Sequence, residues 1–325
     1  MESPTPRLPV PRRSPSRRPA PAREKTGAAP APPASLPAVH HDTAPAATGS
    51  LPLPDGRTLA YAEYGDPDGA PVLFVPGAAS GRRMSFGGPL PHRRRIRLIS
   101  IDRPGLGAST PDPEKTLRSV GADLTRLAHA LTGGPAPTVA NSQGAPFALA
   151  AALHGAATRL VLASPADEAA HPALRPLLPA HFQNLLDTVA TDPEQAARTF
   201  AEYTADGLFD MVLGSHPPCD APVYTDPGFR RMFRAALEEG IAGGPPGYPA
   251  DTVLAMSPWN LDLDRIAVPV SIHYGAHDRA HSPDHCRTLA SRIPAARLHT
   301  DPHAGGSLLW ARPGRILDDA LHPGG

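Results

Sequence analysis

The chain has few cysteines, no long apolar run and no net charge, and each absence excludes a class of protein. Its 325 residues include only two cysteines, Cys219 and Cys286, which suits a reducing compartment and favours a cytoplasmic protein. No stretch approaches the roughly 18 to 20 apolar residues that a membrane helix needs, so we expect no membrane span. Lysine plus arginine (31) equals aspartate plus glutamate (31), so no excess positive charge attracts nucleic acid.

Lysine is nearly missing, since only Lys25 and Lys115 occur, whereas arginine, alanine and proline are abundant. This composition favours a bacterial source with a high-GC genome. The first fifty residues in turn have few large apolar side chains (Leu8, Val10, Leu36 and Val39), and they hold twelve of the 44 prolines and seven lysines or arginines. Such a segment cannot bury enough surface to offset its ordering entropy, so we predict a disordered Pro/Arg-rich tail over residues 1–50. Its arginine pairs are not followed by an apolar segment, which argues against an export signal.

From residue 51 onward, short apolar runs bounded by glycine and proline alternate with helical patterns. This alternation predicts an α/β fold with a mostly parallel central sheet flanked by helices. Over residues 166–258 the strand signal disappears and helical pieces remain, which predicts a helical lid inserted between two core segments, 51–165 and 259–325. The predicted strands are residues 59–64, 72–75, 97–101, 138–140, 159–163, 269–274 and 296–300, and the predicted helices are 117–131, 144–154, 182–189, 195–203 and 229–239.

Ser142 stands where a predicted strand gives way to a predicted helix, in the sequence Val139-Ala140-Asn141-Ser142-Gln143-Gly144-Ala145. Small residues occupy the positions two before and two after the serine. A nucleophile elbow needs this arrangement, because its serine has a strained backbone and larger neighbours would collide. The alternative is a serine that caps an ordinary helix. The order of strand, turn and helix favours the elbow.

Three further motifs carry a resemblance to a known family: Asp102-Arg103-Pro104-Gly105-Leu106-Gly107-Ala108-Ser109, Pro258-Trp259-Asn260-Leu261-Asp262-Leu263, and Tyr274-Gly275-Ala276-His277-Asp278. With the elbow, they make the chain similar, from about residue 51 to its end, to the α/β-hydrolase superfamily of proline iminopeptidases, esterases and haloperoxidase-like proteins. The resemblance implies that Asp278 is the acid of a Ser-His-Asp triad. It also implies an oxyanion hole formed by the backbone N–H groups of Gln143 and Ala78.

The resemblance requires a histidine after Asp278. His303 follows the last predicted strand and is the candidate for the general base. The family's usual pattern here resembles P-G-x-G-H, and aligning Pro302 without a gap puts Gly306 at the histidine position. Either the loop is routed so that His303 reaches Ser142, or the base is missing.

Other candidate sites are less consistent with the sequence. His277, His281 and His285 have helical spacing and could be metal ligands together with Asp278, but Pro283 interrupts the span, so we expect a solvated loop and no metal. The glycines of the 102–109 motif lack the third glycine and the later acid of a dinucleotide site. No cofactor is therefore expected.

These features predict a serine hydrolase that cleaves a small ester, amide or lactone through an acyl-enzyme, with an esterase as the leading candidate. The substrate is expected to have an apolar part, because apolar side chains of the lid either line a pocket or pack in a core: Phe182, Phe200, Tyr203, Phe209 and Met211. Two alternatives remain. A lyase or cyclase of secondary metabolism would tolerate loss of Ser142, and a ligand-binding protein would have no activated serine.

Overall fold

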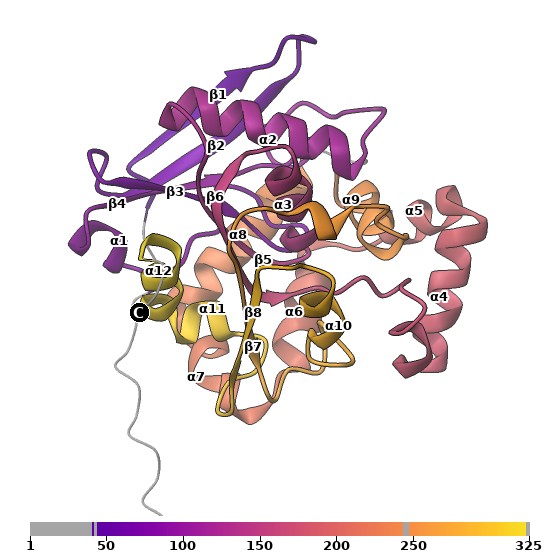
Figure 1. The fold of residues 1–325 in the computed structure, drawn as a ribbon. Helices are drawn as coiled ribbons and strands as arrows, with labels where there is room; N and C mark the ends of the chain where they lie inside the picture. Colours follow the sequence, from indigo (N-terminus) through magenta and orange to yellow (C-terminus); the bar gives the residue numbers. More distant parts are fainter. Residues whose placement is uncertain (1–40, 42–43, 243–246, 323–325) are drawn as a thin grey trace, which may run out of the picture. The chain divides into compact units, whose positions relative to one another are not determined.

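The computed structural model describes residues 41, 44–242 and 247–322. Its centre is an eight-stranded sheet with the strand order β1-β2-β4-β3-β5-β6-β7-β8 (Figure 1). β1 pairs antiparallel with β2, and β2 pairs antiparallel with β4, whereas all pairings from β4 across to β8 are parallel. The strands are β1 (Ala47–Pro52), β2 (Thr58–Gly65), β3 (Ala70–Val75), β4 (Ile96–Ile101), β5 (Ala136–Ser142), β6 (Ala157–Pro165), β7 (Val270–Gly275) and β8 (Ala296–Asp301).

The seven predicted strands correspond to β2 through β8, so the fold prediction is confirmed. β1 was not predicted, because it is a largely exposed edge strand without an apolar run. Its strand conformation comes from backbone pairing with β2, which runs from Ala47 opposite Glu63 to Pro52 opposite Thr58. The tail boundary predicted at residue 50 is therefore wrong, because β1 begins at Ala47. Most of the predicted tail lies outside the described residues.

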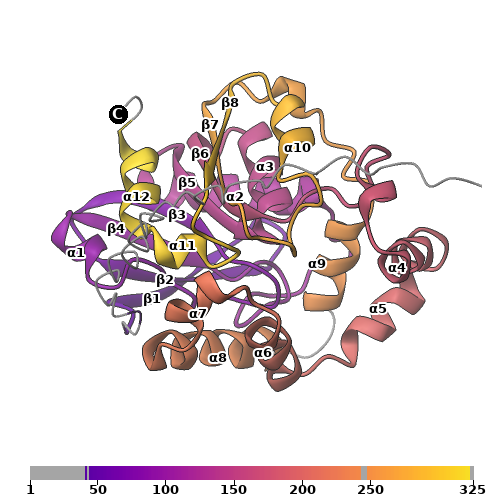
Figure 2. The same ribbon diagram turned by 90° about the horizontal axis from the view of Figure 1, so that it is seen from below.

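Helices cover both faces of the sheet (Figures 1 and 2). One apolar core lies between the sheet and a set of helices that includes α2 (Leu117–Thr132), α3 (Gly144–Leu153) and α10 (Arg287–Ser291). The second core lies on the other face, under α1 (Leu90–Arg93), α11 (Leu308–Ala311) and α12 (Pro313–Leu321). α3 is apolar all round and buried, as expected for a helix packed directly against the sheet.

The described residues between β6 and β7, where the sequence predicts a helical lid, contain helices and no strand. Figure 2 shows that α6, α7 and α8 are grouped together, apart from α4 and α5. The helices of this insertion are α4 (Ala180–Thr191), α5 (Pro193–Ala201), α6 (Ala205–Gly214), α7 (Ala221–Tyr224), α8 (Pro227–Ala242) and α9 (Gly247–Met256). Within the described part of the chain, no helix is both long enough and apolar enough to span a bilayer.

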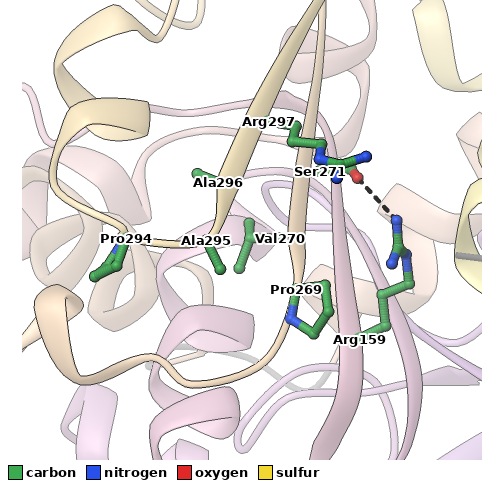
Figure 3. A pocket seen from close by; sticks show the side chains of 8 residues that line it. All are labelled: Arg159, Pro269, Val270, Ser271, Pro294, Ala295, Ala296 and Arg297. Carbon is green, nitrogen blue, oxygen red and sulfur yellow. Dashed lines mark hydrogen bonds between the residues drawn. The ribbon is translucent and has the colours of Figure 1, made fainter. Parts of the chain in front are cut away.

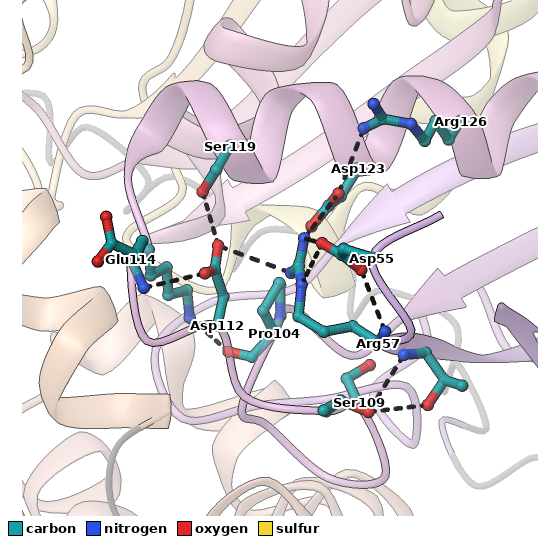
Figure 4. Close-up of polar contacts among 12 residues, drawn as sticks. Asp55, Arg57, Pro104, Ser109, Asp112, Glu114, Ser119, Asp123 and Arg126 are labelled. Carbon is teal, nitrogen blue, oxygen red and sulfur yellow. Dashed lines mark hydrogen bonds and ion pairs between the residues drawn. The ribbon is translucent and has the colours of Figure 1, made fainter. Parts of the chain in front are cut away.

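A polar network ties the turn before β2 to α2 (Figure 4). Arg57 forms an ion pair with Asp123 of α2 at 2.8 Å, and it also pairs with Asp55 at 2.7 Å. Asp112, which accepts a hydrogen bond from Ser119 Oγ, lies 3.6 Å from the same guanidinium. These contacts join the antiparallel edge of the sheet to the segment that leads from β4 into α2.

Candidate active site

Ser142 is the last residue of β5, and α3 begins two residues later at Gly144. Its φ angle is +49°, in the left-handed region that non-glycine residues rarely adopt. Strain of this kind is typical of functional positions. A side chain at Gly144 would place its Cβ 2.3 Å from the Val75 carbonyl oxygen, so only glycine fits there. The structure thus has the strand-turn-helix geometry expected of a nucleophile elbow.

His281 lies between Ser142 and Asp278. Its Nε2 is 3.0 Å from Ser142 Oγ, and its Nδ1 is 2.8 Å from Asp278 Oδ2. Because an ionised carboxylate can only accept, Nδ1 carries the hydrogen and Nε2 accepts from the serine hydroxyl. A serine, an imidazole and a carboxylate thus form one chain of hydrogen bonds, in the orientation that lets the imidazole take the serine proton.

Three groups hold the loop that carries His281. The backbone carbonyl of His281 accepts from Asp167 N at 2.9 Å, just beyond β6. Ser282 Oγ donates to Asp167 Oδ2 at 2.8 Å, and Ser282 N donates to the hydroxyl of Tyr274 at 3.1 Å. Asp278 Oδ1 accepts from the backbone N–H of Ala280 at 3.0 Å. The imidazole is therefore fixed by contacts to the ends of two neighbouring strands.

The charged forms of His281 and Asp278 stabilise each other. Burial alone would lower the pKa of His281, but the charge and hydrogen bond of Asp278 outweigh it, and the pKa lies above the ordinary value of 6.5. Burial would likewise raise the pKa of Asp278. The charge of His281 and the hydrogen bonds that Asp278 accepts outweigh burial and hold the pKa of Asp278 below the ordinary 3.8. The site consequently stabilises the form in which His281 is an imidazolium and Asp278 a carboxylate.

The histidine expected from the sequence is not the one at Ser142. His303 is exposed on the loop after β8, outside the cavity that contains Ser142, and its backbone N–H donates to Asp301 Oδ1. Gly306 comes next to the imidazole instead: a Cβ there would lie 3.2 Å from Cε1 of His281. The side chain of His281 thus occupies the space into which a residue at 306 would project.

One sequence signal pointed to His281. It lies beyond Asp278 in the chain, so the order serine, acid, histidine is kept. Its spacing from His277 and His285, however, resembles that of a set of metal ligands, which is the only role for which His281 is a candidate above. The structure does not gather that set: His281 contacts Asp278 and Ser142, while the ring of His285 stacks on Tyr274 at 5.5 Å.

Arg103 supports the loop after β3, where the second oxyanion donor was predicted. Its guanidinium donates to the carbonyl of Pro76 at 2.5 Å and to that of Gly77 at 3.0 Å. Its Nε donates to Asp251 of α9 at 2.7 Å, and both side chains are completely buried. Lys115 also pairs with Asp251. Because Arg103 donates to these carbonyls, the buried Arg103–Asp251 ion pair fixes the shape of the loop.

Gln143 and Ala78 are the predicted oxyanion residues, and they come from two separate loops, after β5 and after β3. Ala78 lines the same cavity as Ser142, and Gln143 directly follows the serine at the start of α3. The Gln143 side chain donates to Thr252 Oγ1 at 3.1 Å and so is held by α9. The predicted donor to an oxyanion is the backbone N–H of Gln143.

A cavity of about 570 Å³ opens onto Ser142 and His281. Most of its wall is apolar, formed by Met84, Met211, Val212, Tyr224, Phe229, Phe233 and Trp310. Of the five side chains predicted to line a pocket, Met211 does so. Phe200 and Phe209 are buried in the second core, where Phe209 stacks on Phe233 at 5.8 Å. Phe182 and Tyr203 do not line this cavity.

A second cavity, of about 430 Å³, lies at the amino ends of β7 and β8 (Figure 3). Ser142 is at the carboxyl end of β5, which is the opposite edge of a parallel sheet. Arg159 lines this cavity and reaches Ser271 Oγ at 3.4 Å. Its other lining residues are Arg297 and mainly apolar side chains.

Among the described residues, one group could offer a metal three ligand atoms: His273, His299 and Asp319, whose atoms lie within 4.8 Å of one another. Asp319 accepts from His273 Nε2 at 2.8 Å and pairs with Arg159 at 2.5 Å. Burial holds the pKa of His273 below its ordinary value. The guanidinium that neutralises Asp319 opposes a second cation, so the group is explained as an ion-pair cluster joining α12 to the sheet.

The sequence of the chain matches the model of the α/β-hydrolase fold family over residues 70–313, about three quarters of its length. The chain belongs to this family. The match includes Ser142, Asp278 and His281, and it agrees with the sheet order and the elbow described above. A search of curated protein sequences gives no significant match.

Many solved structures share this α/β-hydrolase fold. A hydrolase from Pseudomonas aeruginosa is 24% identical, with a TM-score of 0.63 over 85% of this chain and 99% of that one. An enol-lactonase from Burkholderia xenovorans is 18% identical, with a TM-score of 0.60 over 84% and 99%. A thermophilic esterase from Thermogutta terrifontis is 19% identical, with a TM-score of 0.60 over 84% and 96%. At such identities, the likeness establishes the fold.

Proposed function

We propose that this α/β-hydrolase is a serine hydrolase that cleaves a small ester or lactone through an acyl-enzyme on Ser142. The observation that supports this most directly is the hydrogen-bond chain from Ser142 Oγ through His281 to Asp278, with distances of 3.0 and 2.8 Å. The same three side chains line one cavity. In this proposal His281, and not His303, is the general base.

The reaction would proceed in two halves. Ser142 Oγ attacks the substrate carbonyl while its proton moves to His281 Nε2, and the oxyanion is held by the backbone N–H groups of Gln143 and Ala78. The tetrahedral intermediate expels the alcohol, which takes the proton from His281. Water then attacks the acyl-enzyme with His281 again acting as base, the carboxylic acid leaves, and Ser142 regains its proton.

The cavity supports a substrate with a neutral, apolar portion. Aromatic rings, methionines and Val212 form the apolar part of its wall, and its volume of about 570 Å³ suits a ligand of small-molecule size. The esterase and lactonase among the structural neighbours are consistent with this chemistry. An amide is the less favoured substrate, because its poorer leaving group needs a stronger acid at the same position.

Ser142 is expected to react with a fluorophosphonate probe, because a hydrogen-bonded imidazole makes this hydroxyl a nucleophile. The adduct can be located by mass spectrometry of the digested protein, with Ser142→Ala as the control. Ser164 provides an internal comparison, since it also ends a strand with a positive φ, but is completely buried and has no imidazole partner in the described structure. An intact, folded protein that remains unlabelled at Ser142 would exclude the covalent mechanism.

The labelling rate should fall as the pH is lowered, and the midpoint of this acid limb should lie above pH 6.5. The base must be neutral to accept a proton, and the pKa of His281 is raised by Asp278, so activity is lost as the pH falls through that raised value. Asp278→Asn removes the charge and should move the limb to lower pH while slowing the reaction. The measurement is the pseudo-first-order rate of Ser142 labelling between pH 5 and 9, and an acid limb at higher pH in Asp278→Asn would contradict the assignment of the acid.

A further inference from the structure

A buried carboxylate of the helical insertion contacts the loop after β8. Asp220 ends the 3-10 turn Pro218–Asp220 and is only 1% exposed. Its Oδ1 accepts from Gly305 N at 2.9 Å and from Ser307 Oγ at 2.8 Å, and its Oδ2 accepts from Ser307 N at 3.2 Å. One side chain thus holds two residues that are separated from it by more than 80 positions in the sequence.

The residue between those two is the one that touches the imidazole. Gly306 lies so close to His281 that a Cβ would be 3.2 Å from Cε1. Asp220, Gly306 and His281 all line the cavity that contains Ser142. The position of the wall behind His281 therefore depends on the hydrogen bonds that Asp220 accepts.

The charge of Asp220 also bears on His281. Within the described part of the chain, no lysine or arginine forms an ion pair with Asp220, although a buried carboxylate without a cation is costly. The imidazolium of His281 is a cation that forms beside it during the proposed reaction. Burial lowers the pKa of His281, Asp278 raises it most strongly, and Asp220 adds to that rise.

Other groups facing the imidazole are weaker candidates for this effect. His277 and Arg279 belong to the same loop as His281, line the cavity and are exposed to solvent, which screens their charge. His216 lines the cavity from the insertion, with its Nδ1 at 3.0 Å from the carbonyl oxygen of Pro217. Asp278 and Asp220 both line the cavity, and they are the carboxylates whose charges raise the pKa of His281.

We propose that Asp220 is a positioning residue for His281: it holds the Gly305–Ser307 backbone against the imidazole, and its charge stabilises the imidazolium formed when Ser142 loses its proton. This inference rests on the proposed function. Because Asp220 belongs to the helical insertion, the insertion would then contribute to proton transfer as well as cover the cavity. Substitutions at Asp220 should then alter the chemistry of a residue that Asp220 does not bond directly.

The first test follows the titration of His281 by NMR, using its Cε1–H signal assigned by comparison with His281→Gln. Asp220→Asn should lower the pKa of His281, because a negative charge beside the imidazolium is removed. Asp220→Glu keeps the charge but displaces the carboxylate, so the pKa should stay near the wild-type value. The matched control is Asp123→Asn, a buried carboxylate that pairs with Arg57 far from this cavity. It should leave the titration unchanged.

The second test measures the rate of fluorophosphonate labelling of Ser142 against pH in the same variants. Asp220→Asn should shift the acid limb to lower pH and slow labelling about tenfold at the plateau. Asp220→Glu should slow labelling without shifting the limb. Thermal unfolding of each variant identifies those that no longer fold. If Asp220→Asn does not fold, the labelling rate of Asp220→Glu provides the test instead.

The outcomes separate the two proposals. A wild-type pKa for His281 and a wild-type labelling profile in Asp220→Asn would overturn the role of Asp220 and leave the hydrolase proposal intact. A slower rate with an unchanged limb, matched by Asp123→Asn, would reduce Asp220 to a structural contact and equally overturn it. No labelling of wild-type Ser142 would overturn the hydrolase proposal itself, whatever the NMR titration shows.

Discussion

Replacing His281 by alanine is expected to lower the rate of Ser142 labelling, and of ester turnover, by about 10³- to 10⁴-fold. Nε2 of His281 is the group at 3.0 Å from Ser142 Oγ, so its loss leaves the hydroxyl with no base. Thermal unfolding of the variant measures the stability lost when the buried carboxylate of Asp278 is left without its imidazole partner, and the rates are compared for the folded protein. The rates are measured with the fluorophosphonate probe and with p-nitrophenyl esters of short acyl chains.

His303→Ala is the matched control, because both histidines lie after Asp278 on loops at the same edge of the sheet. His303 is exposed and its described hydrogen bond is through the backbone N–H, so the variant should react at close to the wild-type rate. A collapse of labelling in His303→Ala together with normal labelling in His281→Ala would refute the assignment. The loop after β8 would then have to move before the reaction.

Replacing Arg103 by leucine is expected to lower the free energy of unfolding by about 3 to 5 kcal/mol. The change leaves the carboxylate of Asp251 with one cation instead of two and removes the donors to the carbonyls of Pro76 and Gly77. Ser142 labelling of the folded fraction should slow as well, since Ala78 directly follows these carbonyls. Urea unfolding measures the free energy of unfolding, and the kinetics of the fluorophosphonate probe measure the rate of Ser142 labelling.

Arg175→Ala provides the comparison for Arg103. Arg175 pairs with Asp187 at 2.6 Å, but both side chains are largely exposed, and such surface pairs contribute less than about 1 kcal/mol. If Arg103→Leu destabilises the protein no more than Arg175→Ala, the buried pair does not support the loop after β3 in the way described. If labelling is unaffected in the folded protein, the loop does not depend on Arg103.

Features encoded by neighbouring residues could be predicted from the sequence. The elbow at Ser142 depends on a strand, a serine and a small residue at Gly144, all within a few positions. Asp278 follows an apolar strand that was equally clear. β1 could not be predicted, because its strand conformation comes from pairing with β2 and not from its own side chains.

The proposed base, His281, could not be identified from the sequence because its position depends on how two loops are routed in space. The alignment at Pro302 placed His303 and Gly306 in register with a family pattern, but no sequence rule says which loop fills the space beside Ser142. The role of Arg103 was likewise hidden. Its motif was recognised, yet its partner Asp251 lies 148 positions away, across the insertion.

In the proposed triad, acid and base are three residues apart on the single loop after β7. All groups that exchange protons then come from the first 281 residues, and the β8 strand and the helices after it supply none. Apart from Gly306 and Ser307, which contact His281 and Asp220, that C-terminal part would be free to diverge in sequence as long as it keeps its shape. A search of the family for a histidine near the C-terminus would then miss the proposed base of this chain. A short Asp-x-x-His signature after β7 is the feature by which other members built in this way can be found.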